Sequence, residues 1–484
     1  MKLQLRIGLV LIAVLGLGNP WTLKKVTTAV GGETGNGQEA ATIDSDGDGD
    51  GIEPAPNYVP PEPFVAGQNE AVTLDAAVGP NTLMNSRELC GGRGNTQSET
   101  SMAVSGDVIV SAFNDSRGFY CPQPRSTLGW AFSFDGGQTF TDGGTLPGGV
   151  TPWSNGDPWV AVGPDGAFYI SGISNNFLGM SISRGTVTED GISWSDPVRA
   201  TFGSSGTDKE ALAIDQNTGS IYMAYDVNNA RVEVVRSDDQ AATWTRPTIL
   251  PSPGGIGSFP IIDANGRLYV FWLAGWPNPS QRMVVSSSDD FGDTFSPTVQ
   301  ISQVCPFNVA GFSRGQVPAF PSVAMDRSGG AFDGRIYVAF HSSCGGNGNA
   351  YLTSTDDGGQ TWSVPTTMND DATTGIHYSP NVSVDDLGNV NVFFYDRRNN
   401  PGSSITDVYF TQSTDGGVTF APNIQVNEVA TTWGSTPSDI TPNFGDYITS
   451  LSLGTDVLVT WSDGRNGDPD AYFARLTPAA LSRK

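Results

Sequence analysis

The chain contains the stretch Ser133-Phe134-Asp135-Gly136-Gly137-Gln138-Thr139-Phe140, whose pattern is Ser or Thr, any residue, Asp, any residue, Gly, any residue, Thr, then an aromatic residue. The pattern returns at residues 288–295, 355–362 and 413–420. A copy at 237–244 has Ala241 in place of the glycine, and a shortened copy surrounds Asp190. The carboxylate and hydroxyls of such a stretch can hydrogen-bond to its own backbone, while the glycine takes a conformation that other residues resist. Six copies therefore predict six tight turns of a repeated unit.

A series of glycines supports the same repeat. Each of seven glycines is followed by a short apolar run such as Leu268-Tyr269-Val270. They are Gly106, Gly166, Gly219, Gly266, Gly334, Gly388 and Gly454. Each supplies the positive φ of a tight hairpin, so the run after it should be the second strand of its unit. No stretch has helical periodicity, and repeats of about fifty residues with four short strands are typical of propeller blades. We predict an all-β fold, a β-propeller of seven four-stranded blades over residues 66–480; six blades, with one unit misjudged, is the alternative.

The seventh unit leaves no room for a fourth strand before the chain ends. The segment Ala71-Val72-Thr73-Leu74-Asp75 resembles the expected fourth strand Ile424-Gln425-Val426-Asn427 of the sixth unit. An uncovered sheet edge is a liability. We therefore predict that an N-terminal strand closes the ring.

The N-terminus is typical of an exported protein. Residues 1–25 contain Lys2 and Arg6 before an apolar run at 7–18, which predicts a signal peptide. That run is too short to cross a bilayer, so we expect a secreted, extracellular or periplasmic protein with no transmembrane span in the mature chain; a retained N-terminal anchor is the alternative.

Residues 26–65 form an acidic linker rich in Gly, Pro and Asp, a composition that does not bury enough apolar surface to order itself. Within the linker, the alternating aspartates fit either a calcium-binding loop or an acidic solvated spacer. They are Asp44, Asp46, Asp48 and Asp50. A full EF-hand loop would need Glu at its twelfth position, where Ala55 or Asn57 stands. Calcium is therefore the one cofactor considered, and none is required.

The formal charge of -25 excludes general binding of nucleic acids, which are polyanions. After the first 25 residues the only lysines are Lys209 and Lys484, so nearly all positive charge is arginine. Four cysteines in an exported chain predict two disulfides, with three pairings open. We expect a monomer.

The eight-residue pattern resembles the Asp box, or bacterial neuraminidase repeat, of the sialidase superfamily. The aspartates that match it are Asp135, Asp190, Asp239, Asp290, Asp357 and Asp415. The resemblance implies that each box joins the third and fourth strands of a blade on the face opposite the active site, so the boxes are structural. The loops between second and third strands then lie on the other face. On this repeat map the pairings Cys90–Cys121 and Cys305–Cys344 are favoured, because each clamps an insertion on that face.

Sialidases hold the substrate carboxylate with three arginines, attack with a tyrosine paired to a glutamate, and use an aspartate as acid and base. Three of the upper loops begin with Asp-x-Arg, which makes Arg117, Arg398 and Arg465 candidates for binding such a carboxylate. The alternative is an Asp-capped turn with a local ion pair in each blade.

Tyr447 is the candidate nucleophile, with a tyrosine of the core or rim as the alternative. Asp446 and Glu210 are the candidate catalytic carboxylates. Together with Glu99 and Asp157, they stand at the starts of inner strands and should meet at the mouth of the channel, where they would supply a base, bind a cation or be solvated.

The resemblance implies exo-α-sialidase-type glycoside hydrolysis on extracellular glycans or glycoproteins. Two departures oppose it: the chain lacks the Phe-or-Tyr-Arg-Ile-Pro motif of bacterial sialidases, and seven blades differ from their six. The alternative is a non-catalytic propeller that binds glycans or proteins. The two histidines, His341 and His377, are well separated in sequence, which disfavours a histidine-based zinc site or a serine triad.

Overall fold

The computed structural model describes residues 52–53, 76–121, 126–147, 154–174, 178–201 and 206–478. The predicted signal peptide lies outside these ranges, as do the linker aspartates Asp44, Asp46, Asp48 and Asp50. Among the described residues, no helix combines the length and apolar character needed to cross a membrane. The helical segments of this part are α1 (Arg117–Tyr120) and the single turn η1 (Trp433–Ser435).

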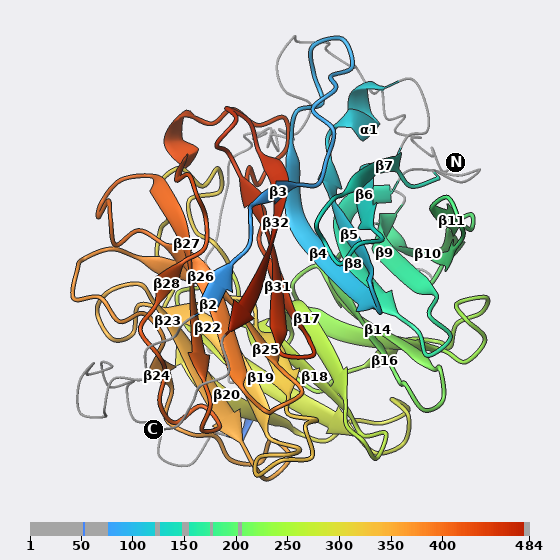
Figure 1. Cartoon of the computed structure of the whole chain (residues 1–484). Helices are drawn as coiled ribbons and strands as arrows, with labels where there is room; N and C mark the ends of the chain where they lie inside the picture. Colours follow the sequence, from blue (N-terminus) through green and yellow to red (C-terminus); the bar gives the residue numbers. More distant parts are fainter. Residues whose placement is uncertain are drawn as a thin grey trace, which may run out of the picture. The chain divides into compact units, whose positions relative to one another are not determined.

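Seven antiparallel sheets follow one another along the chain, each ordered from the inner to the outer strand (Figure 1). Blades 1 to 3 are β4 (Gln97–Ser105), β5 (Val108–Asp115), β6 (Leu128–Ser133) and β7 (Thr141–Thr145); β8 (Ser154–Val162), β9 (Phe168–Ser174), β10 (Gly179–Val187), β11 (Ile192–Trp194) and β12 (Val198–Arg199); β13 (Thr207–Ile214), β14 (Ile221–Val227), β15 (Arg231–Ser237) and β16 (Thr248–Ile249). Blades 4 and 5 are β17 (Gly255–Ile262), β18 (Leu268–Ala274), β19 (Gln281–Ser288) and β20 (Thr298–Val304), with β1 (Ile52–Glu53) parallel to β20; β21 (Ser322–Met325), β22 (Ile336–Ser342), β23 (Asn349–Thr355) and β24 (Thr366–Thr367). Blades 6 and 7 are β25 (His377–Val384), β26 (Val390–Asp396), β27 (Ile405–Ser413), β28 (Ile424–Gln425) and β29 (Thr431–Thr432); β30 (Thr449–Leu453), β31 (Asp456–Asp463) and β32 (Asp470–Pro478). The predicted all-β, seven-bladed propeller is confirmed, and the six-bladed alternative is not.

The second strands begin where the glycine series predicts. All seven glycines have positive φ, between 59° and 86°, and a second strand starts two residues after each. These strands are buried on both faces, since alternate residues point to opposite neighbours. Tyr222 and Ala224 of β14 pack with blade 4, whereas Met223 and Tyr225 pack with blade 2. Seven hydrophobic clusters result, one between each pair of adjacent blades.

The ring closes through an N-terminal segment, as predicted, but with a different strand. β2 (Ala76–Val78) and β3 (Thr82–Leu83) both pair antiparallel with β32 and supply the outer edge of blade 7. The segment 71–75, chosen from its sequence alternation, lies just outside the described residues. Between blades 7 and 1, Leu458 and Phe473 pack against Ile109 and Phe113, which completes the circle of clusters.

The Asp-box turns join third to fourth strands through their own hydrogen bonds. In the copy after β27, Asp415 Oδ1 accepts from the amide of Thr419 at 2.9 Å, and Oδ2 accepts from its hydroxyl at 2.6 Å. Equivalent bonds form at Asp135, Asp239, Asp290 and Asp357. In the shortened copy within the described residues, Asp190 makes no bonds of this kind, and Thr188 bonds to Gly191 instead. These contacts are internal to the turns.

Both disulfides of the favoured pairing are formed, Cys90–Cys121 and Cys305–Cys344. Cys121 follows α1 in the loop between β5 and β6, and Cys344 lies in the loop between β22 and β23. Both loops join second to third strands, so they lie on the face opposite the Asp-box turns. We call this the top face.

Candidate functional site

The inner strands carry a β-bulge near their starts, at the top end of the central channel. Pairing with the second strand shifts register between Ser98 and Ser101 in β4, and at the corresponding point of four other inner strands. The bulged residues Glu99, Asp157 and Lys209 have φ of 56°, 58° and 46°. A positive φ is uncommon for a residue with a side chain and is often associated with functional sites. Here three charged residues from blades 1, 2 and 3 adopt it at equivalent positions.

These bulges bring together a buried ionic cluster, which we call the Lys209 cluster: Lys209, Glu99, Asp157 and Asp446. Lys209 Nζ lies 2.6 Å from Asp157 Oδ2, 2.9 Å from Asp446 Oδ2 and 3.1 Å from Glu99 Oε1. The side chain of Lys209 is 3% exposed. The predicted gathering of inner-strand carboxylates at the channel mouth is therefore observed, but around an ammonium group that the sequence reasoning did not place there.

Within the cluster, the pKa values of Glu99 and Asp157 are shifted in opposite directions. Burial and the charge of Asp157 raise the pKa of Glu99 well above its ordinary value. Burial would also raise the pKa of Asp157, but Lys209 and hydrogen bonds from Glu99 and Asp208 lower it well below its ordinary value. Burial would lower the pKa of Lys209, but the carboxylates of Asp157, Asp446 and Glu99 raise it. An ionised Asp157 thus accepts hydrogen bonds from its protonated neighbours.

Above this cluster lies a top-face pocket of about 80 Å³. Its lining comes from blades 1 to 3 and from the loops that precede blades 5 and 7: Asn114, Phe119, Thr127, Asp157, Ile173, Asp208, Arg314, Ile440, Thr441 and Pro442. Burial, together with the charge of Asp157, raises the pKa of Asp208 to about 7, against the opposing charge of Lys209. A carboxyl that titrates near neutrality is common at functional sites.

Arg314 provides the positive side of this pocket. Its Nη1 lies 2.9 Å from Asp446 Oδ2, and its Nη2 donates to the Thr441 carbonyl oxygen at 3.3 Å. The side chain remains 43% exposed. The pocket therefore offers a guanidinium group, a titrating carboxyl and the ring of Phe119 within one small space.

Tyr447 lines the central channel instead of this pocket. The Tyr447 hydroxyl donates to the carbonyl oxygen of Pro158 at 2.9 Å. Burial and the surrounding carboxylates raise its pKa well above the ordinary value. A nucleophilic tyrosine needs a base and a lowered pKa. The structure therefore favours the core interpretation of Tyr447.

The other two candidate catalytic residues are also buried. Asp446 bonds to Lys209 and Arg314, while Glu210 accepts from the Ser171 hydroxyl at 3.1 Å. Burial raises the pKa of Glu210 well above its ordinary value. Glu210 is 4% exposed and lines the central channel rather than the top-face pocket.

The three candidate arginines each form ion pairs within their own surroundings. Arg117 pairs with Asp115 and Asp142, Arg398 with Asp396 and Asp370, and Arg465 with Asp463 and Glu428. In each case the arginine amide donates to the aspartate two residues earlier. The structure does not bring the three guanidinium groups to a shared ligand position. This geometry favours the capped turn with a local ion pair over the carboxylate clamp.

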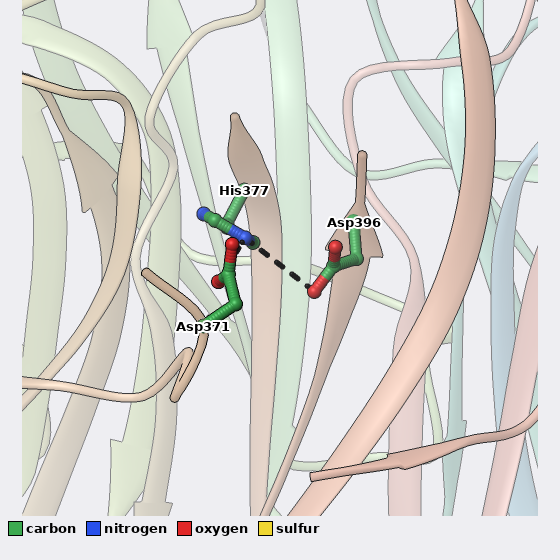
Figure 2. Close-up of side chains that lie close together, drawn as sticks. All are labelled: Asp371, His377 and Asp396. Atoms are coloured by element: carbon green, nitrogen blue, oxygen red, sulfur yellow. Dashed lines mark ion pairs between the residues drawn. The ribbon is translucent and has the colours of Figure 1, made fainter. Parts of the chain in front are cut away.

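Blade 6 adds a histidine to this turn (Figure 2). His377 Nε2 lies 2.9 Å from Asp371 Oδ1 and 3.5 Å from Asp396 Oδ2, and the side chains converge between β25 and β26. Their ligand atoms lie within 4.8 Å of one another, close enough for a metal ion. However, Arg398 Nη2 already lies 2.7 Å from Asp396 Oδ2 and provides a positive charge there. We therefore interpret this group as an ion-pair network.

The family comparison agrees with the repeat geometry. The family model described as "BNR repeat-like domain" matches residues 228–441, which span the outer two strands of blade 3 and blades 4 to 6. The Asp-box turn at Asp135 extends the same repeat beyond that match. The matched region thus coincides with the Asp-box turns of blades 4 to 6. A comparison with curated proteins finds no match.

Several solved structures are similar to this chain at low sequence identity. A protein of unknown function from Dyadobacter fermentans is 14% identical, with 84% of this chain and 99% of that chain covered and a TM-score of 0.46. A Hadza microbial sialidase is 15% identical, with 72% and 73% covered and a TM-score of 0.42. An α-L-arabinofuranosidase from Fusarium graminearum is 13% identical, with 84% and 99% covered and a TM-score of 0.44. These similarities concern the fold.

Three residues of the site were not identified from the sequence. Lys209 carried a usable signal, because it is the one lysine between residues 26 and 483 and stands at the start of an inner strand beside Glu210. Asp208 precedes it, and its role depends on the neighbouring Asp157 of another blade. Arg314 belongs to a long insertion between blades 4 and 5, which has no repeat pattern to indicate where its side chain lies.

Proposed function

We propose that this protein is an exported propeller that binds a saccharide unit of extracellular glycans in its top-face pocket. The observation that carries the proposal is the convergence of Asp208, Arg314 and Phe119 on that pocket. Small-molecule sites typically combine a few polar groups with apolar walls, which fits a sugar ring with its hydroxyls and apolar face. The glycan class is taken from the resemblance of the Asp-box repeats to those of the sialidase superfamily.

The geometry supports binding more than sialidase-type hydrolysis. The hydroxyl of Tyr447 donates to a backbone carbonyl, and the three candidate arginines are held in separate ion pairs. Asp157 and Asp208 share a hydrogen bond. Glycosidases place their two carboxyls roughly 5–10 Å apart, so that they can flank the scissile bond. These two therefore act as one acid–base unit rather than as such a pair.

Hydrolysis remains the second candidate because of one observation. The pKa of Asp208, raised to about 7, suits a proton donor at neutral pH. Hydrolysis would also require a second carboxylate or another group that activates water once the substrate is bound. A fluorogenic sialoside, offered to the pure protein at several pH values, tests this candidate directly.

The binding proposal is tested by titrating the protein with neutral and acidic oligosaccharides in a calorimeter. Saturable heat should be observed, and Arg314→Ala should weaken binding by about tenfold or more, since it removes charge-assisted hydrogen bonds. Arg475→Ala is the matched control, because Arg475 pairs with Asp456 near the turns of the opposite face. Sialoside turnover that survives purification would replace binding with hydrolysis. Equal effects of the two arginine variants would contradict the proposed pocket.

Export is supported by the two disulfides, which are typical of oxidising compartments. We propose that residues 1–25 direct export to the cell exterior or the periplasm, where glycans or glycoproteins would be the partners. A calcium ion bound by Asp44, Asp46, Asp48 and Asp50 would be a further feature of the linker. Mass determination of the mature N-terminus tests the first of these proposals.

A further inference from the structure

The central channel below the Lys209 cluster contains a cavity of about 50 Å³, distinct from the top-face pocket. Four aromatic residues from different blades line it, namely Trp159, Phe259, Phe320 and Tyr447. All four are partly exposed although they lie on or beside the innermost strands. The ring centroids of Trp159 and Phe259 are 5.1 Å apart at 89°, and those of Trp159 and Tyr447 are 6.0 Å apart. We call this group the aromatic cage.

A glycine makes room for the fourth ring. Gly257 has φ +70°, and a Cβ at this position would lie 2.2 Å from a ring atom of Phe320. No side chain fits there without displacing that ring. The backbone of β17 is thus arranged so that Phe320 can lie against it at the cavity wall.

The same cavity is also lined by Lys209 and by two carboxyl groups, each with an oxygen that has no hydrogen-bond partner. Among the described residues, Glu210 Oε2 and Asp446 Oδ1 are buried atoms without a hydrogen-bond partner. Glu210 is 4% exposed and Asp446 is 2% exposed. Buried polar atoms normally have partners, so an orphaned pair that lines one cavity indicates a ligand or ordered water.

The two unpartnered carboxyl oxygens favour a cation as that ligand, because their lone pairs can face it. The acidic side chains around the channel outnumber the basic ones. The acidic ones are Glu99, Asp157, Glu210 and Asp446, and the basic ones are Lys209 and Arg314. Lys209 and Arg314 bond to the same oxygen of Asp446, Oδ2, and leave Oδ1 free. A cation bound beside Glu210 would stabilise its ionised carboxylate, against the burial that raises its pKa.

We propose that the aromatic cage, with Glu210 and Asp446, binds the methylated ammonium head group of a small organic cation. Aromatic faces attract cations, and cages of this kind recognise quaternary ammonium groups. A cavity of about 50 Å³ has room for roughly three to five water-sized groups, which matches such a head group. This site would be separate from saccharide binding in the top-face pocket.

The test compares two probes of equal shape on the full chain. Tetramethylammonium chloride is titrated by calorimetry against sodium chloride at matched ionic strength, and the neutral isostere 3,3-dimethyl-1-butanol is titrated in parallel. The cation should bind saturably, and the alcohol at least about tenfold more weakly. Equal binding of both probes would show an apolar cavity without cation recognition. Absence of saturable heat up to about 10 mM cation would overturn the site, because that limit corresponds to affinity weaker than about 3 kcal/mol.

Variants then identify the groups responsible. Trp159→Leu removes one wall of the cage, and Glu210→Gln removes one negative charge at nearly constant volume. Each should weaken tetramethylammonium binding by about tenfold, while Arg475→Ala on the opposite face should not change it. Unchanged tetramethylammonium binding in both Trp159→Leu and Glu210→Gln would refute the assignment. The comparison of the two probes on wild-type protein needs no variant, so it stands even if a variant fails to fold. Saccharide titration of the same preparations reports the top-face pocket independently.

Discussion

Replacement of Lys209 by methionine should reveal how strongly the channel cluster stabilises the propeller. The substitution removes one buried positive charge and keeps a side chain of similar shape. Lys209 Nζ contacts three carboxylates at 2.6, 2.9 and 3.1 Å, and the side chain is 3% exposed. Removal of one partner of a buried ion pair costs about 3–5 kcal/mol, because the remaining charges stay buried without a counter-ion. We expect Lys209→Met to lower the free energy of unfolding by this amount, about 3–5 kcal/mol, at about pH 8.

The size of this loss should depend on pH in a defined direction. In the variant, Asp157 lacks the ammonium group that lowers its pKa, so it can regain neutrality by binding a proton. The folded variant therefore binds more protons than the folded wild type, so the loss of stability should shrink as the pH falls from about 8 to about 5. A purely steric effect of the substitution would not have this dependence.

Urea unfolding followed by tryptophan fluorescence at both pH values measures the effect. Arg475→Met is the matched control: it removes a salt bridge with Asp456 in which the side chains are 37% and 16% exposed. Such a surface pair contributes about 0–1 kcal/mol. The reasoning is refuted if Lys209→Met loses less than about 1 kcal/mol at pH 8, or if its loss is the same at both pH values.

Three further predictions concern other parts of the fold. In wild-type protein, folded Asp208 has a pKa of about 7 and holds a proton that the unfolded chain has lost, so stability falls as the pH rises from about 4 to 7. Asp208→Asn should flatten this pH dependence. An unchanged slope in thermal scans would contradict the prediction. Asp415→Ala should cost about 1–2 kcal/mol through its lost turn bonds, whereas Asp190→Ala should leave the melting temperature unchanged, and equal shifts would refute the role of the box. Joint Cys305→Ser and Cys344→Ser substitution should lower the unfolding free energy by about 3–4 kcal/mol in urea, and a loss below about 1 kcal/mol would speak against the loop-closure argument.

The blade count was predictable because it depends on local chemistry. A hairpin glycine such as Gly266 and a turn aspartate such as Asp415 do their work within a few residues, so a single sequence shows them directly. Ring closure is not local: the pairing of β2 with β32 joins segments 398 residues apart, Val78 with Leu476. Sequence alternation alone could not distinguish the segment at 71–75 from its neighbour at 76–78, so the predicted strand preceded the observed one.

The site was less predictable because its residues act through contacts between blades. Arg398 follows Asp396 by two residues, so the ion pair between them is local and could be predicted from the repeated triplet. By contrast, the pKa of Asp208 is raised by burial and by the charge of Asp157 from the neighbouring blade. Arg314 reaches the pocket from an insertion without repeat periodicity. Sequence patterns therefore predicted the turns and the position of the inner-strand carboxylates. They did not indicate that these carboxylates surround the ammonium group of Lys209.

The position of Lys209 has a consequence for how the ring is held together. Its partners come from blade 1, blade 2 and blade 7, and blades 7 and 1 meet where the chain closes the circle. One ammonium group from blade 3 thus links both sides of the seam at the top of the channel. The outer edge of blade 7 is completed by β2 and β3, so the strand closure outside and the ionic cluster inside stabilise the same blade. The floor of the top-face pocket depends on this seam, because Asp157 belongs to both the pocket and the cluster. Ligand binding in the pocket and closure of the ring should therefore be thermodynamically coupled through Lys209.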